Sequence, residues 1–172
     1  VDVTDPEAPA LLGEHRLVSL FQGLGVTVRV RGAQAFLLGD LGLDMVDVSD
    51  PAFPYRAGGI APSVRPLAGL YPDLERAGDA ALLATRAAGL EAVDLSFPPL
   101  PLLLTTYQET SAPGSRAVSV VKQGVSAHVA LDRAGIRTLG VDGDGDGILT
   151  VADVCPDEPD PAQADGDFDG VG

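Results

Sequence analysis

The stretch VDVSDPAFP, residues 46–54, decides the fold because the chain contains it three times in related form. VDVTDPEAP (residues 1–9) precedes it by 45 residues and VDLSFPPLP (residues 93–101) follows it by 47, with the prolines in register. A second shared segment recurs at similar spacing, beginning at Gly32, Gly78 and Gly124. A period of about 45 residues is typical of β-propellers, in which four strands form one blade.

Each period contains four short segments that we expect to be strands. In the first copy they cover residues 10–13, 25–31, 34–39 and 43–48, with Gly and Asp-Pro at the turns between them. The stretch from Ala77 to Val93 is rich in Ala and Leu and has high helix propensity. Its register with the other copies nevertheless predicts two strands there, because tertiary packing overrides propensity. The prediction is therefore an all-β fold.

The segments GLDMVDVSDPAFP and GLEAVDLSFPPLP resemble the LVIVD repeat, a family of surface and secreted proteins of bacteria and archaea. The resemblance covers residues 1–141 and implies β-propeller blades, although the third copy lacks the VD-x-S-x-P signature. A propeller ring needs about four to eight blades. We therefore expect a partial β-propeller of about three four-stranded blades, in which residues 1–3 end an upstream blade. A three-bladed or open β-sheet module is the alternative.

The charge of the chain is concentrated at one end. The net charge is −14, from 25 acidic and 11 basic residues, and ten of the acidic residues lie from Asp142 onward, where Lys and Arg are absent. Such a chain repels polyanions, so nucleic acid is not an expected partner. No apolar run approaches the 18 or so residues of a membrane span, so direct membrane insertion is not expected either.

Residues 142–153 have the spacing of an EF-hand-type calcium loop. Carboxylates occupy loop positions 1, 3, 5 and 12, Gly147 at position 6 permits the sharp turn, and position 7 offers a backbone carbonyl. Repulsion between the carboxylates requires a positive charge at the centre of such a turn. The predicted calcium ligands of this loop are Asp142, Asp144, Asp146, Ile148 and Asp153.

The whole segment from residue 142 to residue 172 resembles the thrombospondin type 3 repeat, whereas the first loop alone would also fit a dockerin module. The matching elements are the first aspartate triplet, Asp153, Cys155-Pro156, Pro161-x-Gln163 and a second triplet. The resemblance implies calcium binding outside the cell, with an irregular calcium-stabilised tail over residues 142–172. A solvated acidic linker is the alternative, while the aspartates disfavour a phosphate-binding reading. The further ligands implied are Asp165, Asp167 and Asp169.

In the resembled repeat, the cysteine at the position of Cys155 pairs with one just past the second triplet. Such a partner would fall a few residues beyond Gly172, and the alternative is a small apolar residue packed under the loop.

Few residues of the body point to catalysis. Of the two histidines, His128 replaces Phe36 and Leu82 of the other copies and is expected to pack on a strand, while His15 lies in a polar connection. Carboxylates repeated in each copy are more plausible as turn residues than as catalysts, since catalysis needs one asymmetric site. They are Asp2, Asp47 and Asp94, and, before proline, Asp5 and Asp50.

The expected function is that of a non-enzymatic binding or adhesion protein, extracellular or at the cell surface. A propeller scaffold would present loops to an unidentified extracellular protein or carbohydrate, and calcium would stiffen the stalk. The alternative is a propeller-based secreted hydrolase or lyase whose catalytic blades lie outside this chain.

Overall fold

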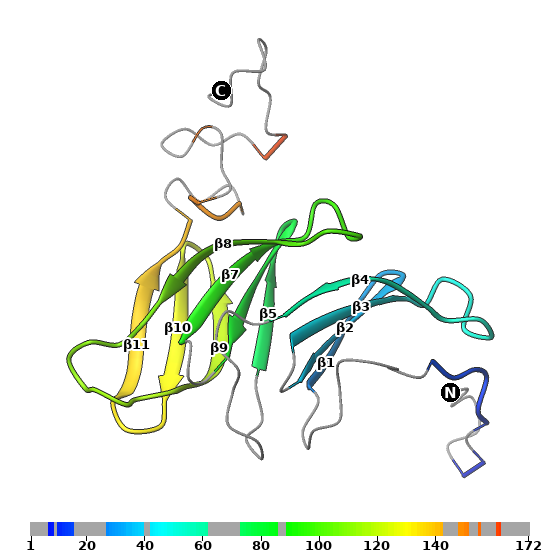
Figure 1. The fold of residues 1–172 in the computed structure, drawn as a ribbon, viewed down its shortest axis with the longest axis horizontal. Helices are drawn as coiled ribbons and strands as arrows, with labels where there is room; N and C mark the ends of the chain where they lie inside the picture. Colours follow the sequence, from blue (N-terminus) through cyan, green and yellow to red (C-terminus); the bar gives the residue numbers. More distant parts are fainter. Residues whose placement is uncertain are drawn as a thin grey trace.

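The chain forms three antiparallel β-sheets in a computed structural model, which describes residues 7–8, 10–15, 27–39, 42–61, 73–85, 89–142, 148–151, 155 and 161–162 (Figure 1). The first sheet contains β1 (Thr27–Arg31), β2 (Gln34–Gly39), β3 (Gly42–Asp47) and β4 (Tyr55–Ile60). The second contains β5 (Asp73–Ala77), β6 (Ala80–Ala84), β7 (Leu90–Asp94) and β8 (Leu102–Tyr107). The third contains β9 (Ala117–Gln123), β10 (Ser126–Leu131) and β11 (Gly135–Gly140).

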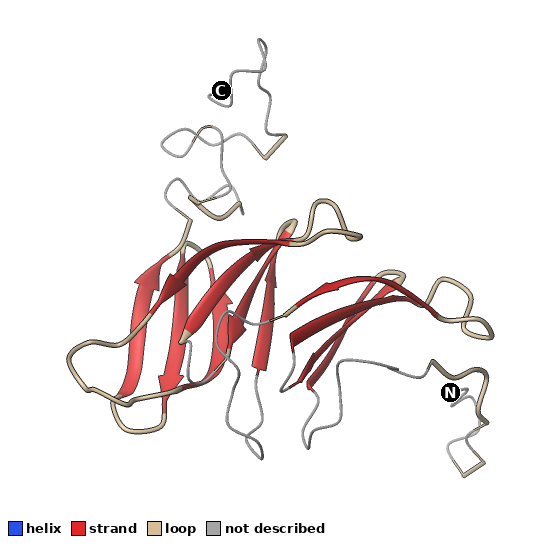
Figure 2. Ribbon diagram, in the orientation of Figure 1, coloured by secondary structure: helices blue, strands red, loops and turns tan. Residues whose placement is uncertain are grey.

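The described residues contain strands, turns and loops but no helix, which confirms the all-β prediction (Figure 2). Within that part of the chain there is accordingly no helix that could cross a membrane.

The sequence repeat is reproduced as a repeat of backbone geometry. The turn between the first two strands of each sheet carries a glycine with a positive φ, of 57° at Gly32, 57° at Gly78 and 55° at Gly124. This left-handed conformation is costly for residues with a Cβ, so glycine recurs there. Each sheet is then built from neighbouring antiparallel strands in chain order.

The sheets are shifted by one strand relative to the sequence repeats. The prediction of a strand at residues 10–13 is wrong, because only Ala10 takes part in a bridge and residues 11–15 are irregular. Its counterparts in the next two copies are β4 and β8, which pair with the third strand of the preceding copy. The Pro-containing turn is therefore a hairpin connection within a sheet, and not a boundary between sheets. The other three predicted strands match β1, β2 and β3, with residues 25–26 outside the described part.

The Ala- and Leu-rich stretch between Ala77 and Val93 folds as β6 and β7, as its register predicted. All five residues of β6 are buried. Strands buried on both faces are continuous apolar runs without alternation, and such runs resemble helical sequence locally. Burial on two faces thus explains both the composition and the strand.

The second sheet lies between the other two. One core contains Phe36, Leu38 and Met45 of the first sheet against Leu83 and Val93 of the second. The other core contains residues of the opposite face of the second sheet and of the third sheet, namely Leu82, Leu90, Ala92, Val120, Ala127 and Val129. The fold is therefore a stack of three sheets that share the middle one.

The carboxylate of Asp73, at the start of β5, connects the first strands of all three sheets. Its Oδ1 accepts a hydrogen bond from Arg29 Nη2 of β1 at 2.7 Å. Its Oδ2 accepts one from the Ser119 hydroxyl of β9 at 2.6 Å and one from the Val120 amide at 3.3 Å. β1 contacts β5 and β5 contacts β9, so the first strands lie side by side in the stack.

We expect Asp73→Ala to lower the free energy of unfolding by about 1–3 kcal/mol, since the buried Val120 amide and the half-buried Ser119 hydroxyl of β9 lose their acceptor, and the partly exposed Arg29 of β1 loses its ion pair. Urea denaturation measures the difference. Asp79→Ala is the matched control, because Asp79 is exposed and its carboxylate lies 3.8 Å from Arg76 Nη2, too far for a strong hydrogen bond. An Asp73→Ala midpoint equal to that of the control would contradict the role of this junction.

Candidate calcium-binding loop

Asp142, the first predicted calcium ligand, lies at the end of β11 and is buried. Its side chain is 1% exposed, and its Oδ2 lies 3.0 Å from Lys122 Nζ. Lys122, the single lysine of the chain, also donates to the Gly124 carbonyl at 2.8 Å. A buried carboxylate requires a compensating charge or hydrogen bonds. Lys122 supplies that charge from β9.

The position of Asp142 follows from the sheet repeat. Each third strand is extended by one backbone hydrogen bond to the first turn of its own sheet: Val48 N to Ala33 O, Leu95 N to Asp79 O, and Val141 N to Val125 O. The next residue is a serine in the first two copies and Asp142 in the third. The amide of Asp142 adds a bond of 3.3 Å to Val125 O. The loop thus begins at a fixed point of the scaffold.

The returning arm of the loop is also anchored. Thr150 N donates to Val141 O at 2.9 Å. Leu149 is 1% exposed and belongs to the core between the second and third sheets. Ile148, which is predicted to ligate through its carbonyl, directly precedes this apolar anchor. The described ends of the loop are therefore held together by one hydrogen bond and one buried side chain.

Two of the eight predicted ligands, Asp142 and Ile148, are described, and the structure places them at the two arms of this anchored loop. Among the described residues, no group of three His, Cys, Asp or Glu side chains is arranged to hold a metal ion. The oxygen donors at hand, a carboxylate and a backbone carbonyl, are of the type that calcium prefers. The ligands that lie outside the described residues are Asp144, Asp146, Asp153, Asp165, Asp167 and Asp169.

An apolar cavity of about 210 Å³ lies beside the anchored loop and was not anticipated from the sequence. Leu90 and Ala92 of β7, Tyr107 of β8, Leu139 of β11 and Leu149 are among its lining residues. It lies between the second and third sheets. The sequence feature that could have indicated this cavity is that the third copy has no segment equivalent to the fourth strands β4 and β8 after its third strand.

A second feature that the sequence did not reveal is a polar cluster around Glu109, after β8. Glu109 Oε2 accepts from Arg137 Nε of β11 at 2.6 Å, and Oε1 accepts from the amide and hydroxyl of Ser111. Arg137 Nη2 also donates to the Ser111 hydroxyl at 3.1 Å. The Ser111 hydrogen bonds, with a smaller contribution from Arg137, lower the pKa of Glu109 to about 2. Every one of these groups has a partner within the cluster, which ties the second sheet to the third.

The repeated aspartates are turn residues, as predicted. Asp47 accepts a hydrogen bond from Ser49 N at 2.8 Å, and Asp94 accepts the equivalent bond from Ser96 N at 2.7 Å. Asp50 accepts from Ala52 N at 2.9 Å. Asp2 and Asp5 lie outside the described residues.

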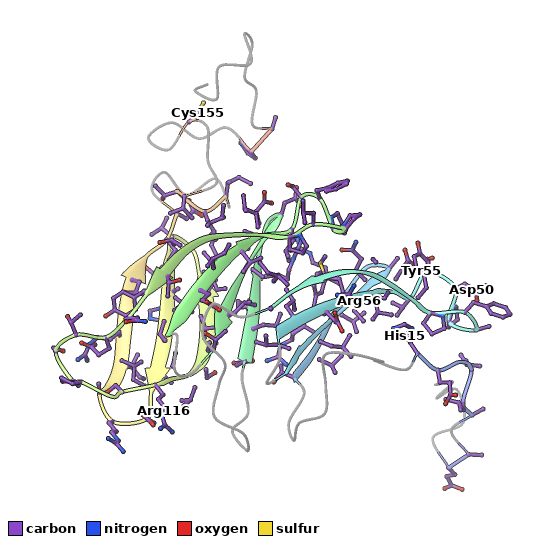
Figure 3. The ribbon with its side chains drawn as sticks, in the orientation of Figure 1. His15, Asp50, Tyr55, Arg56, Arg116 and Cys155 are labelled. Carbon is purple, nitrogen blue, oxygen red and sulfur yellow. The ribbon has the colours of Figure 1, made fainter. Side chains whose placement is uncertain are left out.

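The two histidines are placed in different surroundings. His128 is a half-buried residue of β10 whose Nδ1 lies 3.0 Å from Thr138 Oγ1, so the prediction of a strand residue is confirmed. His15 lies on the irregular N-terminal segment, beside the turn that carries Asp50 (Figure 3). Cys155 is half-buried and is the single cysteine of the chain, so a disulfide bond would need a partner from outside these residues.

Comparisons of the chain with protein-family models, with curated proteins and with solved structures found no match. The resemblances to the LVIVD repeat and the thrombospondin type 3 repeat therefore stay predictions, based on the residues that carry them.

We expect the Glu109 cluster to stabilise the fold in a pH-dependent manner. Because the pKa of Glu109 lies below its ordinary value of 4.5, its contribution is fully present above that pH and is lost as the pH falls towards 2. Thermal unfolding of the parent chain and of Glu109→Gln from pH 7 to pH 3 measures this. The gap between their midpoints should narrow below pH 4.5.

Ser111→Ala provides the second test, because it removes the hydroxyl that contributes most to the lowered pKa of Glu109. The difference in unfolding midpoint between Ser111→Ala and the parent chain should narrow over the same pH range. A gap that stays constant from pH 7 to pH 3 for both variants would contradict the assignment.

Proposed function

We propose that this chain is a calcium-binding, non-enzymatic binding or adhesion protein of the cell surface or the extracellular space. Its three sheets are three blades of a partial β-propeller, and residues 142–172 form a calcium-stiffened stalk. The observation that carries the proposal is the buried Asp142, fixed by Lys122 just after the end of β11, where the acidic loop departs.

The stacking of the sheets supports the propeller assignment. Propeller blades are antiparallel sheets of four strands that pack face to face around an axis, with their first strands innermost. Here the first strands β1, β5 and β9 are neighbours joined through Asp73, and each sheet packs on the next. The fourth strands β4 and β8 lie at the opposite edges of their sheets from β1 and β5. This arrangement fits an arc of a ring whose third blade has three strands in the described part.

The surroundings of Asp142 support the calcium assignment. A carboxylate at loop position 1 must point inward together with those at positions 3 and 5. Lys122 neutralises this one carboxylate, whereas the sequence supplies no basic residue for the nine acidic residues that follow. Calcium would provide the missing positive charge, and it would be held by Asp142, Asp144, Asp146, Ile148 and Asp153.

The polar groups of the body support a scaffold role in preference to catalysis. Asp73, Glu109 and Asp44 each bind a basic side chain of a neighbouring strand, at 2.7, 2.6 and 2.8 Å. These ion pairs connect strands to one another. Catalytic groups are instead aimed at a substrate site.

We expect calorimetric titration of the chain with calcium to show binding that Asp146→Ala largely removes, because position 5 is an inward-facing ligand of the loop. A dissociation constant near or below about 10⁻³ M would suit extracellular calcium. Asp157→Ala is the control, since Asp157 contributes to neither aspartate triplet. No calcium-dependent heat from the parent chain would disprove the proposed function.

We further expect Lys122→Met to have opposite effects with and without calcium. Without calcium it should lower the free energy of unfolding by about 1–3 kcal/mol, because the buried Asp142 carboxylate loses the compensating charge of Lys122. With calcium it should strengthen binding by about tenfold, equivalent to about 1.4 kcal/mol, because a cation next to a ligand oxygen is removed. Arg133→Met, in an exposed turn, controls for the change in net charge. Weaker calcium binding by Lys122→Met than by this control would refute the competition between Lys122 and calcium.

A further inference from the structure

Among the residues that the structure describes, the third sheet has an open strand edge. β3 and β7, the third strands of the first and second sheets, pair with β4 and β8 respectively. β11 is their counterpart, and within the described residues it pairs with β10 alone. Open edges of this kind are sites at which a further strand can be added.

The direction of the backbone groups on β11 follows from its last hydrogen bond. Val141 N donates to Val125 O in the turn between β9 and β10, so the amides of alternate residues point to the β10 side. The amides and carbonyls of Ile136, Thr138 and Gly140 therefore point to the open edge. The Ile136 side chain is 70% exposed at this edge.

The apolar cavity marks the place of a missing fourth-strand side chain. Between the first and second sheets, Leu103 of the fourth strand β8 packs against the core. The corresponding space between the second and third sheets is the cavity of about 210 Å³, lined by Tyr107, Leu139 and Leu149. A strand added to β11 would bring a side chain to the mouth of this cavity.

The chain carries a fourth-strand segment that lies outside the three sheets. ALLGEH, residues 10–15, follows VDVTDPEAP just as β4 follows VDVSDPAFP and β8 follows VDLSFPPLP. With the prolines in register, Leu11 corresponds to Leu103. Leu11 is 70% exposed. The segment runs past the turn at Pro51 and Ala52, at the opposite end of the stack from β11 (Figure 1).

We propose that residues 10–15 of a second copy of this chain pair with β11 and complete the third sheet, with Leu11 in the cavity. The inference uses the propeller arrangement proposed above and does not depend on calcium. Because β11 and residues 10–15 lie at opposite ends of one copy, the strand must come from another copy. Two reciprocal donations join six sheets, within the range of four to eight blades that closes a ring.

The order of strands along the chain fits this exchange. β4 completes the first sheet and then leads to β5 of the second, and β8 leads in the same way to β9. Residues 10–15 lead to β1, so the donated strand would bring the first sheet of its own copy onto the third sheet of the other.

The two faces that would meet carry exposed and half-buried side chains, and these are partly apolar. On the third sheet this face carries His128, Ala130 and Ile136, at the register positions of Leu82, Ala84 and Leu90, which pack in the core between the second and third sheets. On the first sheet it carries Val28 and Leu37, at the positions of Leu74 and Leu83. Val28 is exposed and Leu37 is half-buried, whereas both counterparts are buried in the core between the first and second sheets.

Sedimentation velocity of residues 1–172 at about 1–100 μM tests the proposal, with and without a calcium chelator. We expect a dimer in both conditions. Leu11→Lys should raise the dissociation constant at least about tenfold, because a charge would enter an apolar cavity. Leu100→Lys is the matched control, since Leu100 is 73% exposed in a turn and should leave the dimer intact.

Ile136→Pro tests the acceptor edge. It removes an amide that points to the open edge and keeps the pairing of β11 with β10, so it should weaken the dimer while circular dichroism stays unchanged. A mixture of Leu11→Lys and Ile136→Pro should associate more strongly than either variant alone, because residues 10–15 of the Ile136→Pro copy and β11 of the Leu11→Lys copy form one intact junction.

Three outcomes would overturn the proposal. If the chain stays monomeric even at about 100 μM, another segment or another protein must cover β11. Dimers that Ile136→Pro disrupts and Leu11→Lys does not would indicate direct pairing of two β11 edges. Failure of the mixed variants to associate would also exclude strand donation. Loss of calcium binding alone, with the dimer intact, would count against the proposed function and leave this inference standing.

Discussion

The second sheet must be covered on both faces, and the rest of the structure depends on this constraint. β6 and β7 present apolar side chains alternately to the two sides, with Leu83 and Val93 in one core and Leu82 and Ala92 in the other. At about 25 cal/mol per Å² of buried apolar surface, such a sheet is unstable with either face in water. The first and third sheets supply the two covers.

The polar contacts between the sheets fix their position relative to one another. Asp73 joins β1, β5 and β9, while Arg137 and Glu109 join β11 to the loop after β8. Hydrophobic packing is non-directional and tolerates sliding of one sheet over another. Charge-assisted hydrogen bonds of 2.6–2.7 Å specify one alignment, because a displaced sheet would leave a largely buried carboxylate without its donor.

The sequence predicted those parts of the fold that repeat and missed those that occur once. The glycines at 32, 78 and 124 and the aspartates at 47 and 94 recur, so their turn roles could be inferred from spacing alone. The segments of β4 and β8 were predicted as strands but assigned to the wrong sheet, because a Pro-containing turn is equally compatible with a hairpin and with a boundary between sheets. Asp73 and Lys122 act across sheets, through contacts between residues 20 to 47 positions apart, which no local pattern records.

The end of β11 is where the acidic segment and the open edge meet. Thr150 binds the carbonyl of Val141, and Leu149 enters the core beyond the last residue of the strand. The backbone groups of Ile136 to Gly140 that face outward lie before this point. The described ends of the loop, residues 141–142 and 148–151, therefore lie beyond the outward-facing backbone groups of β11. A metal in the loop and a strand on the edge of β11 are compatible with this placement. The loop and the edge of β11 share three neighbours: Val141, Leu149 and the cavity between the second and third sheets. Any coupling between calcium binding and assembly must therefore act through these residues.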